Sequence, residues 1–483
     1  MGSVVLCAGR NARLPEEQGA IGPSAGACRN RATTPPVPDP RRPNAGISCQ
    51  RKLRRDGHEG DPVNNNRVVI IGGGFAGLSA AKTLEGNDVQ VTLVDSRNYY
   101  LFQPLLYQVA TGDLHAEAVA TPIRRLLRGK NQKFVLGSVT GVDPGQKRVL
   151  LEDGSVLPYD RLLVAPGSTT QFYGNQEIAR HAWHLKGLPE AENLRSQILL
   201  ALERASRCPD PGQRRAWLNF AIAGGGSTGV ESACGLLELF RVLVPRDYPE
   251  IDPREISVRI LQGGACLIPD FPESLQTYAT KRVEALGGRI QFQTHVENFD
   301  GRTIRLSGGE SLSARTLIWA AGVKAPRLAE NLPGEQGEGG RIRVNSHLQL
   351  PEYPDIFILG DLAQTPDGHH PQVAPFAIQT ARHAARSVLA SWGMAPLPPP
   401  FVYQDPGSMV VLGRFDAVCQ IPRWNARWHG PVAWALWLGL HLAKILGTRN
   451  RLLTLADWGQ DYLFKSAAME ILRPLQGSER SGE

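Results

Sequence analysis

Short runs of β-branched and apolar residues alternate along most of the chain with longer stretches of helix-forming composition. Three of these runs, residues 67–71, 89–94 and 217–223, are each long enough for one buried strand. The first and the third run lead directly into glycine-rich turns, after which residues of helical composition follow. Alternation of strands and helices predicts an α/β fold, and 483 residues leave room for two to four domains.

The first turn, residues 72–77 (GGGFAG), has the strand, turn and helix context of a dinucleotide-binding unit. Gly72 permits the tight turn, Gly74 lets the backbone approach a pyrophosphate, and Gly77 allows the helix to pack closely on the strand. Asp95 ends the next strand, where a carboxylate can accept hydrogen bonds from a ribose. The alternative is a glycine-rich turn without a ligand.

The second turn, residues 224–229 (GGGSTG), repeats this arrangement after the apolar run 217–223. Its next strand, residues 256–261, ends in Gln262 and not in an acid. A carboxylate at this place would repel the 2′-phosphate of NADPH, whereas a neutral amide carries no repulsion. The sequence therefore indicates a nicotinamide site that is compatible with NADPH as well as NADH.

Charge is informative mainly through its distribution. The formal net charge is +7, but only 20% of the residues are charged. Residues 1–66 carry ten Lys and Arg and six Asp and Glu, many Pro and Gly, and no apolar periodicity, so we expect a disordered N-terminal extension. Glu16, Glu17 and Asp39 make it a poor transit peptide, and a start codon set too far upstream would look the same.

The seven cysteines are scattered without CxxC or metal-ligand spacing, which predicts thiols in a reducing compartment and no metal site. A disulfide or sulfide oxidoreductase needs a redox cysteine pair beside its flavin. No cysteine lies between Cys49 and Cys208 or between Cys266 and Cys419, which argues against that class.

From Arg67 to about Pro474 the chain resembles the type II NADH dehydrogenases, single-subunit NADH:quinone oxidoreductases built from two dinucleotide-binding domains. Seven segments carry the resemblance, of which LFQPLLYQVAT, APFAIQ and RNRLLTLADW are the most specific. The segments are residues 68–81, 101–111, 222–231, 317–323, 356–363, 374–379 and 449–458.

The resemblance implies FAD and NAD(P)H as cofactors and assigns residues to both. Those implied for FAD are Gly72, Gly74, Phe75, Ala76, Gly77, Asp95, Pro104, Val139, Ala165, Gly167, Gly360, Asp361 and Pro375. Those implied for NAD(P)H are Gly224, Gly226, Thr228, Gly229, Glu231, Gln262, Ala321 and Gly322. Pro375 suits the first turn of a helix whose N-terminus faces the flavin.

By the same resemblance, Glu231 and Gln379 are the candidate catalytic residues. Glu231 would stand between nicotinamide and flavin, although an acid in a first helical turn also stabilises the helix by itself. Gln379 would line the quinone site, or be an ordinary helix amide. Thr380 stands where the family usually has a second glutamine, which weakens predicted headgroup contacts. Ala165-Pro166-Gly167 replaces the usual Ala-Thr-Gly and reads as a crossover turn between the domains.

Basic and aromatic residues are concentrated near the C-terminus. Residues 417–456 contain five Lys and Arg and no acid, and five of the nine tryptophans lie between Trp424 and Trp458. The apolar run 431–446 is too short to span a bilayer, which takes about 20 residues. We expect this region to lie in a lipid interface, with a buried helical pair or a dimer interface as the alternative. His441 is expected to be a packing or interfacial histidine and not a ligand.

The resulting expectation is a discontinuous FAD domain (67–188 and 323–395), an NAD(P)H domain (189–322), and a membrane-association and dimerisation region (396–483). The predicted activity is oxidation of NADH, or NADPH, by a membrane quinone without proton pumping. Partners would be the quinone, a lipid surface and a second copy in a homodimer, but not nucleic acid. Peripheral attachment on the cytoplasmic, stromal or matrix face is expected. His383, Arg382 and Lys465 are further candidates near the quinone. The alternatives are a non-quinone acceptor and a redox-sensing or nucleic-acid-binding flavoprotein.

Overall fold

The computed structural model describes residues 66–368, 370–464 and 471–472. The extension expected at residues 1–66 thus lies outside the described residues except for Asn66, and so does Lys465. Asn66 is buried, and its carbonyl accepts the N–H of Gln90 at 2.9 Å. It therefore belongs to the folded part of the chain.

A five-stranded parallel sheet in the order β20-β9-β1-β2-β5 contains the first predicted strand. Strand β1 is central and nearly fully buried, because a parallel sheet is covered on both faces. Strand β20 lies beside β9 although it comes much later in the chain. The strands are β1 (Arg67–Ile71), β2 (Gln90–Asp95), β5 (Gln132–Leu136), β9 (Arg161–Val164) and β20 (Ile356–Ile358).

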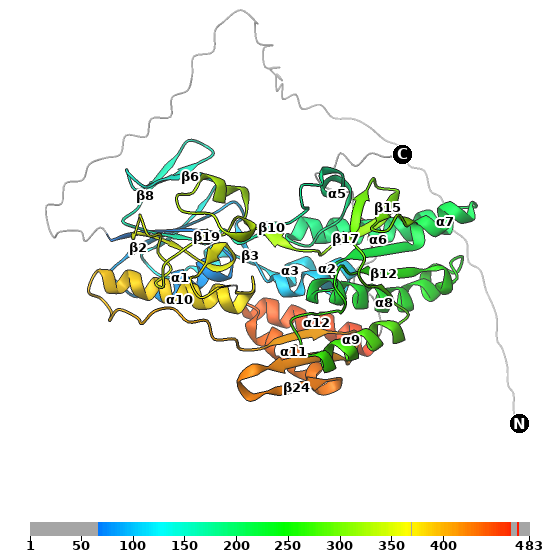
Figure 1. Ribbon diagram of the computed structural model, residues 1–483. Coiled ribbons are helices and arrows are strands. Elements are labelled where there is room, and N and C mark those ends of the chain that lie inside the picture. Colours follow the sequence, from blue (N-terminus) through cyan, green and yellow to red (C-terminus); the bar gives the residue numbers. More distant parts are fainter. Residues whose placement is uncertain (1–65, 369, 465–470, 473–483) are drawn as a thin grey trace, which may run out of the picture. The chain divides into compact units, whose positions relative to one another are not determined.

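Helix α1 (Phe75–Leu84) leaves β1 through the first glycine turn and packs along α10 (Ala374–Ser391), as the blue and yellow helices in Figure 1 show. Smaller elements complete this half. They are β3 (Tyr99–Leu101), α2 (Leu106–Thr111), α3 (Ala116–Val119), β4 (Ala120–Pro122), α4 (Ile123–Leu126), and the antiparallel strands β6 (Val139–Asp143), β7 (Arg148–Leu151) and β8 (Val156–Pro158).

A second parallel sheet, β13-β12-β11-β17, contains the second predicted unit. The prediction of an α/β fold with two such units is confirmed. The strands are β11 (Asn219–Ala223), β12 (Ser257–Leu261), β13 (Arg289–Gln291) and β17 (Thr316–Trp319). The helices are α5 (Gln176–His181), α6 (Leu188–Ser206), α7 (Pro211–Leu218), α8 (Ser227–Asp247) and α9 (Glu273–Ala285), and a small sheet holds β14 (Val296–Phe299), β15 (Thr303–Leu306) and β16 (Ser311–Ser313).

The strand predicted at 217–223 was two residues too long. Trp217 and Leu218 end helix α7, whose start is capped by the Asp210 carboxylate accepting the N–H of Gln213 at 2.7 Å. The Arg315 guanidinium lies 5.6 Å from the centre of the Trp217 ring and holds this helix end. A cap and a tertiary contact thus outweigh the strand preference of tryptophan.

Two short strands, β10 (Thr169–Thr170) and β18 (Val323–Lys324), pair antiparallel where the chain passes between the two sheets. Before the expected boundary at residue 188, α5 packs on β14, and Trp183 forms a parallel bridge with Ile318 of β17. Two further short strands, β19 (Ile342–Arg343) and β21 (Ala363–Gln364), pair with each other. The exact domain limits remain a prediction.

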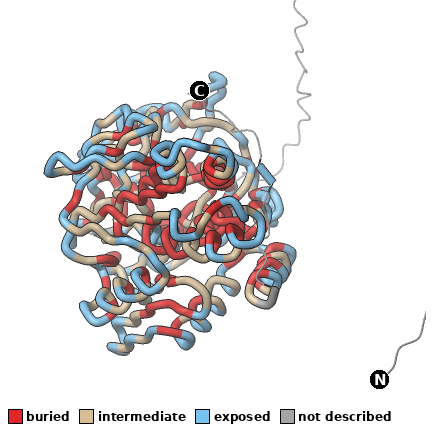
Figure 2. Tube along the Cα trace, turned by 90° about the vertical axis from the view of Figure 1, so that its right-hand side faces the viewer, coloured by how far each residue is buried: buried red, intermediate tan, exposed pale blue. Residues whose placement is uncertain are grey.

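The C-terminal part consists of the antiparallel strands β22 (Ser408–Val411), β23 (Ala417–Ile421) and β24 (Ala426–His429), followed by α11 (Pro431–Lys444) and α12 (Thr448–Phe464). Helix α12 packs against α3 and α11. Figure 2 shows buried stretches inside the molecule and exposed segments around them. None of the helices in the described part of the chain is both long and apolar enough to cross a bilayer.

The tryptophans of this region correct part of the prediction. Trp437 is fully buried and Trp458 is 3% exposed, whereas Trp424 is 70% exposed. Two of the five tryptophans are therefore core residues and cannot insert into lipid. His441 stacks on Trp437 with ring centres 4.3 Å apart and meets Phe102 edge-on, which confirms its packing role.

Candidate functional site

The first glycine turn is tight for a steric reason. Gly72 has φ +99°, and a Cβ there would lie 2.1 Å from the carbonyl oxygen of Ala165. A Cβ on Gly77 would lie 1.8 Å from the carbonyl oxygen of Gly72. At Gly74, in contrast, no described heavy atom lies within 4 Å of the Cβ position. The turn is thus closed at two glycines and open at the third, which leaves space for a ligand at the start of α1.

Asp95 at the end of β2 supports this turn. Its Oδ2 accepts the N–H of Gly73 at 2.6 Å, and its Oδ1 accepts the N–H of Arg97 at 2.7 Å. One carboxylate therefore fixes the first glycine turn.

The second glycine turn has the same construction. A Cβ on Gly224 would lie 2.5 Å from the carbonyl oxygen of Ala320, and one on Gly229 would lie 1.9 Å from that of Gly224. The position at Gly226 is open within 4 Å among the described atoms. Gln262 takes the place of Asp95: its Oε1 accepts the N–H of Gly225 at 2.8 Å. Both turns can thus receive a dinucleotide pyrophosphate at a helix N-terminus.

Gly360 and Asp361 form the turn after β20, next to the start of α1. Gly360 has φ +61°, and its Cβ position is 3.6 Å from the Cβ of Ala76 and 3.2 Å from that of Ala377. The hydroxyl of Ser168 donates to Asp361 Oδ2 at 2.5 Å. Ser168 in turn accepts a hydrogen bond from Lys186 Nζ at 3.0 Å.

Sequence reasoning missed both Lys186 and Ser168. Burial lowers the pKa of Lys186, and the charge on Asp361 opposes this change. The resulting chain connects one half-buried cation to the predicted flavin aspartate. The only signal in the sequence was a lysine in a short segment before α6, which is too common a feature to single out.

Helix α10 begins beside this turn, with Pro375 in its first turn as predicted from the sequence. Thr380 is fully buried; its hydroxyl accepts the N–H of Gly360 at 3.0 Å and lies within hydrogen-bond distance of the Phe376 carbonyl. Thr380 therefore holds the Gly360 turn against α10. A glutamine at position 380 would be longer and would have to make this contact with Gly360 in another way.

Gln379 points to a different partner. Its amide donates to the carbonyl oxygen of Gln404 at 2.8 Å and accepts the N–H of Gln404 at 3.0 Å. These two hydrogen bonds fasten α10 to the segment that leads into β22. The role of Gln379 at a quinone site stays a prediction.

Glu231 lies in the first turns of α8 and is 9% exposed. Its Oε1 accepts the N–H of Val411 at 3.3 Å. Burial raises the pKa of Glu231 to about 8, and the Val411 N–H partly opposes this change. The group is therefore largely protonated at neutral pH and can donate or return a proton.

The remaining predicted residues fall on several elements. Phe75 and Ala76 begin α1, Pro104 lies in the 3-10 turn Gln103–Leu105, and Thr228 lies in the first turn of α8. Ala165 contacts the first glycine turn, as described, and Gly167 follows with φ +74°. Ala321 accepts a hydrogen bond from the Tyr173 hydroxyl at 2.8 Å, next to Gly322. Val139 lies in the separate sheet of β6, β7 and β8, where it pairs with Leu151.

Comparison with known proteins adds the family to this geometry. The model of the pyridine nucleotide-disulphide oxidoreductase family matches residues 66–386. The type II NADH:quinone oxidoreductase Ndh of Mycobacterium tuberculosis is 38% identical over 416 residues, which cover 83% of this chain and 89% of that protein. The chain belongs to the type II NADH:quinone oxidoreductase family. A type II NADH:quinone oxidoreductase of Haemophilus influenzae is 29% identical over 73% of this chain and 86% of its own. The predicted family is thus confirmed.

Solved structures support the same fold. NDH2 from Plasmodium falciparum, in complex with NADH, has a TM-score of 0.78 at 19% identity and covers 84% of this chain and 100% of its own. The sulfide:quinone oxidoreductase of Aquifex aeolicus has a TM-score of 0.63 at 16% identity, over 82% and 95% of the two chains. At such identities the likeness establishes the fold alone.

Proposed function

We propose that the protein oxidises NADH and passes the electrons to a membrane quinone, with FAD as its redox cofactor. The observation that carries this proposal is the pair of matching glycine turns, each open at its second motif glycine, Gly74 and Gly226. They lie on the two sheets of a chain whose relatives are named NADH:quinone oxidoreductases.

The residues around the first turn fit FAD. Gly72, Gly74 and Gly77 would leave the pyrophosphate room at the start of α1, and Asp95 would bind the ribose of its adenosine half. Asp361 would bind the ribityl chain at the other end. FAD, when bound, supplies reversible acceptance of two electrons. The limits that we propose for this domain are residues 67–188 and 323–395.

The second turn, in a domain that we place at residues 189–322, would bind the pyrophosphate of NADH at the start of α8. Gln262 carries no negative charge against a 2′-phosphate, so we propose that NADPH is also accepted. Glu231 lies two residues after Gly229, the last glycine of the turn. It would orient the nicotinamide and hold a proton. Gln379 would border the path of the quinone.

Attachment to a lipid surface is the finer part of the proposal. Helices α11 and α12 expose apolar side chains, and exposed basic ones lie where the two helices meet, which suits a helix pair lying in an anionic interface. The apolar residues are Val432, Leu436, Leu440, Leu452 and Leu455, and the basic residues are Lys444, Arg449 and Arg451. We include in the proposal a homodimer and attachment on the cytoplasmic, stromal or matrix face.

An anaerobic titration tests the function. The purified holoenzyme is reduced with NADH or NADPH, and ubiquinone, menaquinone or plastoquinone analogues are then added while flavin absorbance is followed. We expect bleaching by NADH and rapid recovery with at least one quinone. Bleaching without recovery by any quinone would remove the acceptor half of the proposal.

A further inference from the structure

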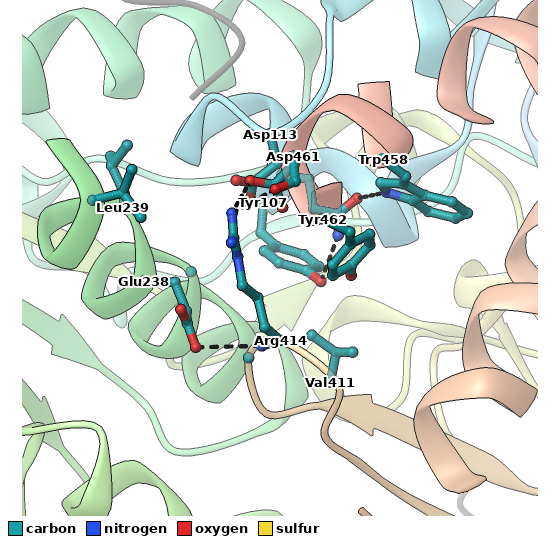
Figure 3. Close-up of a pocket in the computed structure, with 13 residues that line it drawn as sticks. Tyr107, Asp113, Glu238, Leu239, Val411, Arg414, Trp458, Asp461 and Tyr462 are labelled. Atoms are coloured by element: carbon teal, nitrogen blue, oxygen red, sulfur yellow. Dashed lines mark hydrogen bonds and ion pairs between the residues drawn. The ribbon is translucent and has the colours of Figure 1, made fainter. Parts of the chain in front are cut away.

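The face of helix α8 that carries Glu231 also lines a small cavity. Gly235, Glu238 and Val242 follow Glu231 at spacings of four, seven and eleven, so all four lie on one face of the helix. The last three line a cavity of about 40 Å³, drawn in Figure 3. Such a volume has room for about three or four water molecules, at roughly 10–15 Å³ each.

Acidic side chains reach this cavity from two other elements. Asp113, just after α2, accepts a hydrogen bond from the Thr111 hydroxyl at 2.7 Å. Asp461 of α12 pairs with the guanidinium of Arg414, which also donates to the Asp461 carbonyl oxygen at 2.9 Å. Figure 3 shows the two carboxyl groups beside each other, with Arg414 pointing toward them. We call Asp113, Asp461, Arg414 and Glu238 the acidic cluster.

One guanidinium faces more than one carboxyl group in this cluster. Burial raises the pKa of Asp113 to about 8, and the negative charges of Asp461 and Glu238 raise it further. The Thr111 hydroxyl and the Arg414 guanidinium oppose this increase. Burial also raises the pKa of Asp461. Tyr107 and Tyr462 are the other titratable groups that line the cavity. The pair Asp113 and Asp461 therefore retains one proton at neutral pH.

Tyr107 connects the cluster with Glu231. Its side chain lines the cavity, and its hydroxyl accepts a hydrogen bond from Gln108 Nε2 at 3.2 Å. Burial raises the pKa of this hydroxyl, and the charges on Glu231, Tyr462 and Asp113 raise it further. Asp113 and Tyr462 line the same cavity, and Gly235, one helical turn after Glu231, lines it too. A tyrosine hydroxyl can accept one hydrogen bond and donate another. Val411, whose N–H binds Glu231, lines the same cavity.

The rim of the cavity is formed by two partly buried residues, Arg414 and Glu238. The side chain of Arg414 is 16% exposed. Glu238 is half-buried and accepts the backbone N–H of Arg414 at 3.3 Å. Water can therefore reach the cluster at this rim while Glu231 remains buried.

We propose that this cavity is a proton entry route, leading from solvent at Glu238 and Arg414 through Asp113 and Asp461 and then Tyr107 to Glu231. The proposal rests on the proposed function. Reduction of a quinone by NADH consumes one proton: NADH + H⁺ + quinone → NAD⁺ + quinol. The hydride supplies both electrons and one hydrogen nucleus, and the second must come from water.

The test separates the two half-reactions in the holoenzyme by stopped flow, with Asp113→Asn as the main variant. Flavin bleaching by NADH should stay within about 2-fold of the wild type. Recovery with a quinone should slow by about 10-fold or more, because loss of a proton donor removes on the order of 10²–10⁴ in rate. Its solvent isotope effect should grow, and added formate should partly restore the rate. In the wild type, recovery should decline above pH 8.

The matched control is Asp457→Asn, one turn earlier on α12. Its carboxylate binds the His115 N–H at 3.1 Å and ring nitrogen at 2.9 Å and does not line the cavity. This variant should recover at the wild-type rate. Since Asp461→Asn alone would remove the salt-bridge partner of Arg414, it is combined with Arg414→Gln, and this double variant should also slow recovery.

Normal recovery and an unchanged isotope effect in Asp113→Asn would overturn the proton route alone. So would slow recovery that formate does not relieve and that Asp457→Asn reproduces, since both would then reflect loss of structure. Failure of every quinone to reoxidise the wild type would instead contradict the proposed function, on which the route depends.

Discussion

Gln262 Oε1 accepts the N–H of Gly225 at 2.8 Å, as Asp95 Oδ2 accepts that of Gly73 at 2.6 Å. The amide of Gln262 also donates to the carbonyl oxygen of Cys266 at 3.0 Å. A carboxylate, Asp95, thus supports the first glycine turn, and a neutral amide, Gln262, supports the second in the same way. The electrostatic difference between the two sites follows from this exchange.

Gln262→Glu should make the enzyme discriminate against NADPH. The new carboxylate repels a 2′-phosphate, and a like-charge contact costs several kcal/mol. We expect kcat/KM for NADPH to fall by about 10-fold or more, with a much smaller change for NADH, in parallel steady-state assays. Gln262→Asn, which stays neutral, is the control. Strong rejection of NADPH by the native protein would show that Gln262 is not permissive.

Gly74→Ala and Gly77→Ala should separate cofactor binding from folding. A Cβ at residue 77 meets the Gly72 backbone oxygen at 1.8 Å, so this variant should lose about 2 kcal/mol or more of stability. A Cβ at residue 74 meets no described atom within 4 Å, so the apoprotein should keep its melting temperature but bind FAD more weakly. Calorimetry of the apoprotein and FAD titration measure the two effects. Equal loss of stability in both variants would mean that Gly74 also serves the fold.

Glu231→Gln should flatten the pH dependence of stability. The folded-state pKa of Glu231 is raised to about 8 from 4.5, so between these values the folded protein keeps a proton that the unfolded chain releases. The free energy of unfolding therefore falls as pH rises from 4.5 to 8, by an amount on the order of a few kcal/mol. Glutamine cannot ionise and removes this slope.

Urea unfolding at pH 5 and pH 8 measures this change in the free energy of unfolding, in the wild type and in Glu231→Gln. Glu273→Gln, which removes an exposed acid from the first turn of α9, should keep the wild-type slope. Turnover measured on the same Glu231→Gln samples shows whether the residue also serves catalysis. Loss of stability without loss of turnover would leave only the structural role.

Leu436→Glu combined with Leu440→Glu should release the protein from lipid. These side chains are 41% and 43% exposed, so the fold should tolerate the change. Binding to anionic vesicles should weaken by about 10-fold or more, because two charges oppose burial in the interface. Leu136→Glu, at a position 58% exposed in β5, is the control. Turnover with a water-soluble quinone should stay within about 2-fold; unchanged vesicle binding would place the lipid contact elsewhere.

The two β-strand, turn and helix units could be predicted because the three motif glycines of each turn meet either a backbone oxygen or open space, so few other residues fit. The residues of each unit follow one another closely in the sequence, so a local pattern is enough to recognise it. The acidic cluster could not be predicted, since Asp113 and Asp461 meet only after the entire chain has folded. No spacing in the sequence relates such distant carboxyl groups.

Tertiary contacts explain the other differences. Trp217 looked like a strand residue, but its contact with Arg315 holds it at a helix end. The composition around Trp437 and Trp458 suggested lipid anchors, but both side chains are buried in the core. The departure at Thr380 was visible in the sequence, whereas its hydrogen bond to Gly360 depends on how α10 lies beside β20.

The position of β20 at the edge of the first sheet has a consequence during synthesis. A ribosome releases β1, β2, β5 and β9 early, but the sheet lacks its last strand until residues 356–358 emerge. The second sheet, inserted between β9 and β20, has emerged in full before then. The inserted half should therefore fold first, while the edge of β9 stays exposed to chaperones or to misassembly until β20 covers it.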